Sequence, residues 1–286
     1  MTHEIQNRKG ATKLENIPEQ VLKLLNEGTI ESVNLTEWLA VNHTALVATV
    51  FPKIGISDTY VSEIQEIIKN QKKPSTMNTT KLIGAFLYEK YAKSTDYLAV
   101  FEKLATHLSD SVRCYATYFM ALNTDFSLEK KLGLLQPLVA DKHFGVREVV
   151  WMALRPELSQ NLAFSIDFLS VWAKNKDENI RRFSSEALRP RGVWCSHIET
   201  LKNSPELALP ILEKLKSDSA KYVQDSVGNW LNDASKSRPD FVQELCKRWE
   251  KESPIKSTEY IIKKSFKNHF KVAKYCKGEK CFAPTS

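Results

Sequence analysis

Apolar residues recur at three- and four-residue spacing along nearly the whole chain, which is the pattern of amphipathic helices. Pro18 begins one such segment and Gly28 follows its end, an arrangement typical of a helix. Asn34 and Glu37 form a capping pair for a helix predicted over 35–51, which Pro52 ends. Alternating strand patterns are absent, so we expect an all-α fold. Further helices are predicted at about 59–70, 80–92, 96–108, 111–122, 127–140, 145–156, 161–174, 178–188, 205–217, 221–235, 239–250 and 258–270.

A short pattern recurs at the start of every second predicted helix: an acidic or polar residue, then a β-branched residue, then a base or an amide. The intervals between the β-branched residues are 34, 34, 43 and 38, which is the period of stacked helix pairs. The sequence therefore predicts a HEAT-like α-α solenoid, with the arginine-bearing second helix of each pair lining the concave side. The β-branched residues are Val112, Val146, Ile180, Val223 and Ile261.

The repeats predict one HEAT-like domain over residues 1–270, with N-terminal helices at about 18–95 and clear repeats at about 96–270. Residues 271–286 form a lysine-rich end that we expect to be a flexible tail. The chain has a net charge of +7, and residues 260–286, with seven lysines and one glutamate, account for +6 of it. Net charge alone therefore favours nucleic-acid binding only weakly.

Composition narrows the class of protein further. The longest apolar run, Ala45–Phe51, is too short for a membrane span, and the N-terminus lacks the apolar segment of a secretory signal. Five scattered cysteines do not form a disulfide framework, so we expect a cytoplasmic protein with no membrane partner. Cys276 and Cys281 have the spacing of half a metal site, but no second pair of ligands accompanies them. We expect no metal and no cofactor, since no glycine-rich phosphate loop or nucleophile elbow is present.

The longest repeat interval contains an insertion, Arg189-Pro-Arg-Gly-Val-Trp-Cys195. Insertions in solenoids map to loops on one face, often the binding face. Guanidinium groups fit phosphates, and the indole of Trp194 can stack on a base or sugar. The alternative is a proline that ends a helix, with Trp194 packed under the next one.

The segment Ser185–Trp194, Ser-Glu-Ala-Leu-Arg-Pro-Arg-Gly-Val-Trp, resembles the Ser-Glu-Gly-x-Arg-Pro-Arg-Leu-Pro-Trp signature of the bacterial DNA alkylation repair family of AlkC and AlkD type. Residues 218–233 are similar to that family's Asp-x-x-x-x-Val-x-x-Ser-Val-x-Asn-x-Leu-Asn-Asp stretch. The openings Arg8-Lys-Gly-Ala and Ile17-Pro-Glu-Gln-Val also resemble the family, so the resemblance covers roughly residues 8–250.

The resemblance implies a HEAT-like solenoid that holds duplex DNA, and we expect a monomer. Active members of the family remove N3- or N7-alkylated purines by hydrolysing the N-glycosidic bond, and those of AlkD type do so without fully flipping the base, which we also expect here. The alkylated base is already a cationic leaving group, so the catalytic demand falls on the sugar. An oxocarbenium-like transition state needs a carboxylate near the anomeric carbon and aromatic faces beside it.

The resemblance and the repeat positions together assign roles to individual residues. Asp177 is expected to stabilise the sugar cation and orient water, and Trp194 to contact the lesion or sugar. Trp151 and Trp230 lie at helical positions that fit either the core or the DNA groove. Each candidate phosphate-binding arginine has an alternative role, as one step of an inter-repeat ladder to Asp110, Asp141, Asp177 or Asp218. The candidate DNA-binding residues are Arg113, Arg147, Arg181, Arg182, Arg189 and Arg191.

His143 stands where the family pattern has a glutamate that is associated with catalysis. A histidine supplies no fixed negative charge, although a neutral imidazole can accept a proton from water. The sequence also departs from the signature at Ala187 and at Gly192-Val193. The sequence therefore fits an active glycosylase but also fits two alternatives. The alternatives are a catalytically silent paralogue that binds damaged or branched DNA, and a protein-binding HEAT scaffold.

Overall fold

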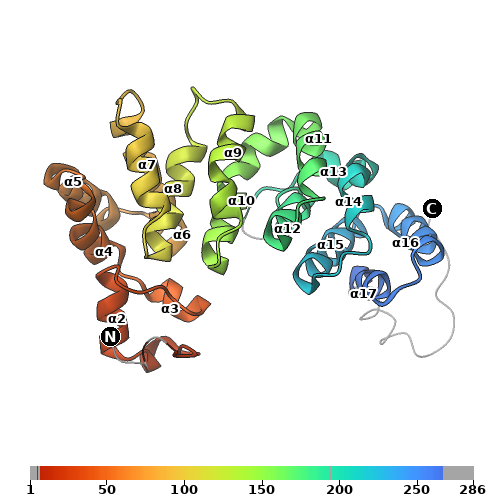
Figure 1. The fold of residues 1–286 in the computed structure, drawn as a ribbon, viewed down its shortest axis with the longest axis horizontal. Coiled ribbons are helices and arrows are strands. Elements are labelled where there is room, and N and C mark those ends of the chain that lie inside the picture. The colour runs from red at the N-terminus through yellow and green to blue at the C-terminus, as the bar shows by residue number, and fades with distance from the viewer. Residues whose placement is uncertain (1–4, 6, 193–194, 267–286) are drawn as a thin grey trace. The chain divides into compact units, whose positions relative to one another are not determined.

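The computed structural model describes residues 5, 7–192 and 195–266. These residues form α-helices and short 3-10 helices, with no strand among them, and the fold is the predicted all-α helical repeat (Figure 1). Two compact units are distinguished, residues 1–153 and 154–286, here called the N-terminal unit and the C-terminal unit. The prediction of a single repeat domain over 1–270 stays a prediction. Trp194, the lysine-rich end, Cys276 and Cys281 lie outside the described residues.

The N-terminal unit is built around α8 (Asp110–Ala121), which packs against α6, α7 and α9. Residues 110–120 of α8 are all buried. Gly84 of α6 allows α8 to approach closely, because a Cβ at this position would lie 2.5 Å from the Cβ of Tyr118. The helices before α8 are α2 (Glu19–Asn26), α3 (Leu35–Ala40), α4 (His43–Val50), α5 (Asp58–Lys69), α6 (Thr76–Tyr91) and α7 (Tyr97–Ala105), followed after α8 by α9 (Leu128–Val139). Two 3-10 helices, η1 (Leu14–Asn16) and η2 (Pro52–Ile54), lie among them.

The C-terminal unit contains two layers of helices. In one layer α12 packs against α15 and α15 against α17, and in the other α11 packs against α14 (Figure 1). Trp230 and Trp249 are among its largest fully buried side chains. Helix α10 (Phe144–Gln160) begins in the N-terminal unit and ends in this one. The remaining elements are α11 (Leu162–Trp172), α12 (Glu178–Glu186), α13 (Glu199–Asn203), η3 (Pro205–Ala208), α14 (Leu209–Leu215), α15 (Lys221–Ala234), α16 (Pro239–Glu252) and α17 (Lys256–Ser265).

The repeat register predicted from the β-branched residues agrees with the core. Val112, Val146 and Val223 have no exposed surface, and Ile180 is 6% exposed. Each of these four is the third residue of its helix, and the fifth member, Ile261, is also fully buried. The β-branched residues of the repeat pattern are therefore core positions in both units.

Two local predictions need correction. The segment expected to be one helix over 35–51 forms two helices, because Val41 is extended and the side chain of Asn42 caps α4 by accepting the N–H of Ala45 at 3.1 Å. Helix α13 (Glu199–Asn203) was not predicted, since it is only five residues long. Within the described residues, no helix combines the length and apolar character that crossing a membrane would require.

Candidate functional site

Arg113 is held entirely within the N-terminal unit. Its Nε and Nη2 donate to Asp141 at 2.7 and 3.1 Å, and Nη2 also donates to Glu31 at 2.5 Å. Its Nη1 donates to the carbonyls of His107 and Leu108, both at 2.8 Å. Burial alone would lower the pKa of Arg113, but the hydrogen bonds to the two carboxylates outweigh it and raise the pKa. All five N–H groups are used, which favours the ladder role over a phosphate contact for this arginine.

The same geometry recurs along the chain. Arg181 donates from Nη1 to the carbonyls of residues 175 and 176, both at 2.9 Å, and from Nε and Nη2 to Asp218 at 2.6 and 3.0 Å. Nη1 of Arg147 donates to the carbonyls of residues 141 and 142, and the amide of Gln224 to those of 218 and 219. The hydrogen bond to Asp218 raises the pKa of Arg181. Each base or amide thus satisfies carbonyls in the turn before its own helix.

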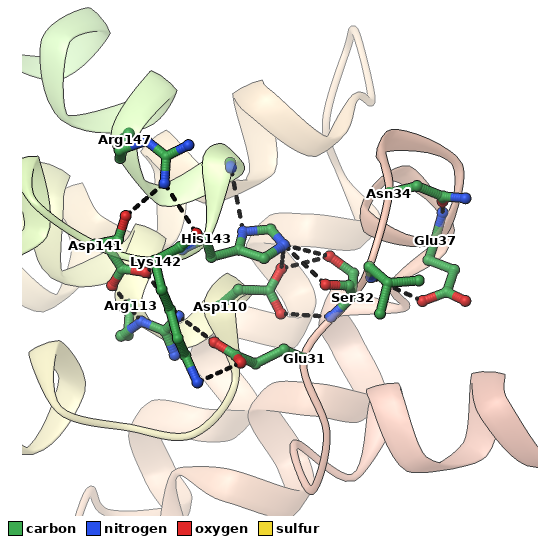
Figure 2. A network of polar contacts seen from close by, with 12 residues as sticks. Glu31, Ser32, Asn34, Glu37, Asp110, Arg113, Asp141, Lys142, His143 and Arg147 are labelled. Carbon is green, nitrogen blue, oxygen red and sulfur yellow. Dashed lines mark hydrogen bonds and ion pairs between the residues drawn. The ribbon is translucent and has the colours of Figure 1, made fainter. Parts of the chain in front are cut away.

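His143 lies in a buried polar network of the N-terminal unit (Figure 2). Its Nδ1 accepts the N–H of Gly145 at 3.1 Å, so it caps the start of α10. Nδ1 is therefore unprotonated, and Nε2 carries the proton that it donates to the carbonyl of Ser32 at 3.0 Å. The carboxylate of Asp110 lies 3.5 Å from the same nitrogen. His143 is 7% exposed, so this arrangement favours a structural role over activation of water.

The signature segment of the C-terminal unit contains a second buried network. Nη1 of Arg189 donates to Glu186 at 2.9 Å, and its Nε and Nη2 donate to Asp233 at 2.9 and 2.7 Å. The other oxygen of Glu186 accepts the hydroxyl of Ser226 at 2.8 Å, and that hydroxyl contacts Ser185 at 2.8 Å. These contacts tie the end of α12 and the following loop to α15.

The carboxylate of Glu186 is ionised despite being only 4% exposed. Burial alone would raise its pKa, but the charges of Arg182 and Arg189 and the hydrogen bonds from Arg189 and Ser226 outweigh burial, so the pKa is lowered. Burial alone would lower the pKa of Arg189, but Glu186 and Asp233 raise it. Glu186 is therefore committed to this network, which argues against a role for it as the acid that is missing at position 143.

Arg155 holds the loop that carries the Arg-Pro-Arg motif. Its three guanidinium nitrogens donate to the carbonyls of Ala187 at 2.8 Å, Arg189 at 2.6 Å and Ser196 at 3.1 Å. The side chain is buried, with 2% exposed, and burial lowers the pKa of Arg155. Trp230 adds a further support, because its indole N–H donates to the carbonyl of Leu188 at 3.0 Å. One buried cation thus fixes both ends of the loop.

Two further candidate arginines differ in whether a carboxylate lies close enough to neutralise their charge. Arg182 lies over the ring of Tyr222 at 4.3 Å and 3.6 Å from Glu186. Nη2 of Arg191 donates to Ser237 at 2.7 Å, its Nε is buried without a hydrogen-bond partner, and no described carboxylate forms an ion pair with it. Arg191 is therefore the arginine of the motif whose charge is best available to a phosphate.

The remaining candidates are placed as follows. Trp151 and Trp230 are 3% and 1% exposed, so both are core side chains and offer no stacking face. Asp177 is half-buried at the N-terminus of α12, where its Oδ1 accepts the N–H of Asn179 at 2.7 Å. Sequence reasoning missed the roles of Arg155 and Asp233. Asp233 ends the stretch that resembles the family, whereas Arg155 interrupts an apolar helix with no spacing signal.

Comparison with known proteins adds to this geometry. A model of the DNA alkylation repair enzyme family matches residues 158–264, which include the Arg-Pro-Arg loop and the network of Glu186, Arg189 and Asp233 but not Arg155. Over these residues the resemblance to the DNA alkylation repair family is confirmed. An uncharacterized protein, YhaZ of Bacillus subtilis (strain 168), is 39% identical over 128 residues, 45% of this chain. The match spans about a third of that relative's length (34%).

Two solved structures share the fold. Pseudomonas fluorescens alkylpurine DNA glycosylase AlkC, bound to DNA containing an abasic site analog, aligns over 92% of this chain and 66% of its own, with a TM-score of 0.66 and 20% identity. AlkD2 from Streptococcus mutans aligns over 73% of this chain and 97% of its own, with a TM-score of 0.56 and 22% identity. At these identities the likeness supports the helical repeat architecture.

Proposed function

We propose that this protein binds duplex DNA and acts in DNA alkylation repair, as a glycosylase for cationic N3- and N7-alkylpurines. The observation that carries the proposal is the family match over residues 158–264. The matched range includes the loop whose residues Ala187 and Arg189 are held by Arg155 and by the pair of Arg189 with Asp233. The structural likeness to a glycosylase bound to DNA supports the same function.

In the proposed reaction the leaving group needs no activation by the protein. An alkylpurine with a positive charge departs as a neutral base, so the protein must stabilise the sugar cation and direct water to it. We assign the carboxylate of Asp177 to this role, because its cap of α12 fixes one oxygen and leaves the side chain half-buried. We assign Arg191 to a phosphate contact, and Trp194 to the lesion or sugar as the resemblance implies.

A second function, binding of damaged or branched DNA without catalysis, is favoured by His143. This residue replaces the expected glutamate, and its imidazole is engaged by the N–H of Gly145 and by Ser32. A His143→Glu variant tests whether restoring the acid at this position is enough to give base release. It introduces a carboxylate beside Asp110, so we expect reduced stability, by about 1–3 kcal/mol, and no gain in base release.

The glycosylase proposal is tested by incubating the protein with methylated duplex DNA and measuring released bases. We expect release of 3-methyladenine or 7-methylguanine by the wild type and a loss of about 100-fold in Asp177→Asn. Asparagine is as good a helix cap as aspartate, so this variant removes the charge while keeping the fold. If the wild type releases neither base, the glycosylase proposal fails.

DNA binding is tested separately with an undamaged duplex at several salt concentrations. Arg191→Ala should weaken binding and reduce the slope of log K against log salt by about one, because one phosphate contact releases about one counterion. Arg238→Ala is the matched control, since Arg238 is neutralised by Asp240 at 2.9 Å. Salt-dependent binding without base release supports the silent DNA binder. Absence of binding leaves the protein-binding scaffold as the remaining function.

A further inference from the structure

An open groove lies between α5 and α6 of the N-terminal unit, beside the loop 70–75 that joins them. Its volume is about 780 Å³, and its apolar lining is formed by Ile67, Leu82 and Ala85. Ile67 is 37% exposed, whereas Ile64 and Ile83 of the same two helices are each 1% exposed. Helices α5 and α6 therefore pack together without using the outer surface of Ile67, which remains exposed to solvent.

The groove has a basic rim. Lys72, Lys73 and Lys81 line it and are exposed, and the structure gives none of them a carboxylate partner among the described residues. Glu66 is the single acidic residue of the lining, and its carboxylate lies 3.8 Å from Lys69. An apolar surface thus lies within reach of three unneutralised ammonium groups, a combination that stability of the unit does not require.

We propose that this groove binds an acidic peptide segment of a partner protein that inserts at least one large apolar side chain. The apolar lining favours a leucine or aromatic anchor, and the lysines favour carboxylates on either side of it. A DNA duplex would satisfy the lysines with phosphates but would leave the apolar lining exposed, since its bases are stacked. A peptide between two helices complements both parts of the surface.

The probe is a fluorescein-labelled peptide, Glu-Asp-Leu-Asp-Asp-Phe-Asp-Glu, titrated with the full chain and followed by fluorescence anisotropy. Its control has serine in place of leucine and phenylalanine. We expect the parent peptide to bind at least tenfold more tightly than the serine peptide, and its affinity to fall as salt is raised. Equal affinity for the two peptides would mean that only charge is recognised, and would overturn the proposal.

Variants locate the binding surface. Reversal of the three rim lysines should weaken binding of the parent peptide at least tenfold, and Ile67→Ser should weaken it several-fold. The rim variant changes only exposed side chains, so it remains informative if Ile67→Ser lowers stability, which a melting curve will show. The rim variant is Lys72→Glu, Lys73→Glu and Lys81→Glu, and its control with equal charge change is Lys13→Glu, Lys23→Glu and Lys53→Glu.

Binding of the same variants to a 20-base-pair DNA duplex distinguishes a peptide-binding groove from a DNA-binding one. Unchanged DNA binding in the rim variant, with loss of the peptide, supports the proposal. Loss of DNA binding with an unchanged peptide affinity would assign the groove to phosphate contacts and overturn it. Equal weakening of the peptide by the rim variant and its control would also overturn it, because the effect would then be one of net charge.

Discussion

Arg155 offers the sharpest test of how the signature loop is held. Arg155→Met keeps most of the buried aliphatic stem and removes the guanidinium, and with it three hydrogen bonds to the carbonyls of Ala187, Arg189 and Ser196. A hydrogen bond to a charged group contributes about 1.5–3 kcal/mol when its partner is left buried. The carbonyl of Ser196, an exposed residue, regains a hydrogen bond to water. Removal of a buried cation also offsets part of the free energy lost with the other two hydrogen bonds. We therefore expect a net loss of about 3 kcal/mol.

The assay is urea unfolding combined with thermal melting. A loss of about 3 kcal/mol corresponds to a decrease in Tm of roughly 6–12 °C for a unit of this size class. Arg191→Met is the matched control from the same loop, because it removes one hydrogen bond, to Ser237. It should cost no more than about 1 kcal/mol. Equal urea midpoints for Arg155→Met and Arg191→Met would refute the view that Arg155 fixes the loop.

Two further predictions concern the interior. Since the pKa of Glu186 is lowered in the folded protein, its contribution to stability is complete above the unfolded value of about 4.3 and is lost as pH falls through the folded pKa. The gap in urea midpoint between wild type and Glu186→Gln should therefore narrow from pH 7 to about pH 3, and a constant gap would contradict this. Gly228→Ala should cost about 1–3 kcal/mol, because a Cβ there lies 2.8 Å from the Cβ of Lys264. Gly133→Ala, with no atom within 4 Å of the added Cβ, should be neutral or stabilising in the same melting assay.

Much of the fold could be predicted from the sequence because helix ends and buried positions leave local signals. Half of the capping pair of Asn34 and Glu37 forms: the side chain of Asn34 accepts the N–H of Glu37 at 2.9 Å, whereas the carboxylate of Glu37 accepts the N–H of Val33 at 3.0 Å. The repeat spacing identified core positions such as Val112 and Val223. The division of 35–51 into two helices was missed because Asn42 follows an apolar pattern that continues across the break.

The site was less predictable because pairing between distant residues leaves no periodic trace. The sequence is compatible with two roles for each arginine, whereas in the structure Arg113 uses every donor within the unit and Arg191 does not. Trp151 and Trp230 fitted either the core or a groove until their burial was known. Arg155 has no sequence signal, since its partners are main-chain carbonyls whose identity does not depend on residue type.

The ladder between Arg181 and Asp218 has a consequence for the loop it spans. The pair joins consecutive repeats directly, at 2.6 Å, and the extra residues of the longest interval lie between its two members in the sequence. A change in the length of this insertion need not alter how the flanking helices pack against each other. A designer could therefore exchange residues 191–195 for segments of other lengths, provided that the anchor points of Arg155 at Ala187, Arg189 and Ser196 are kept.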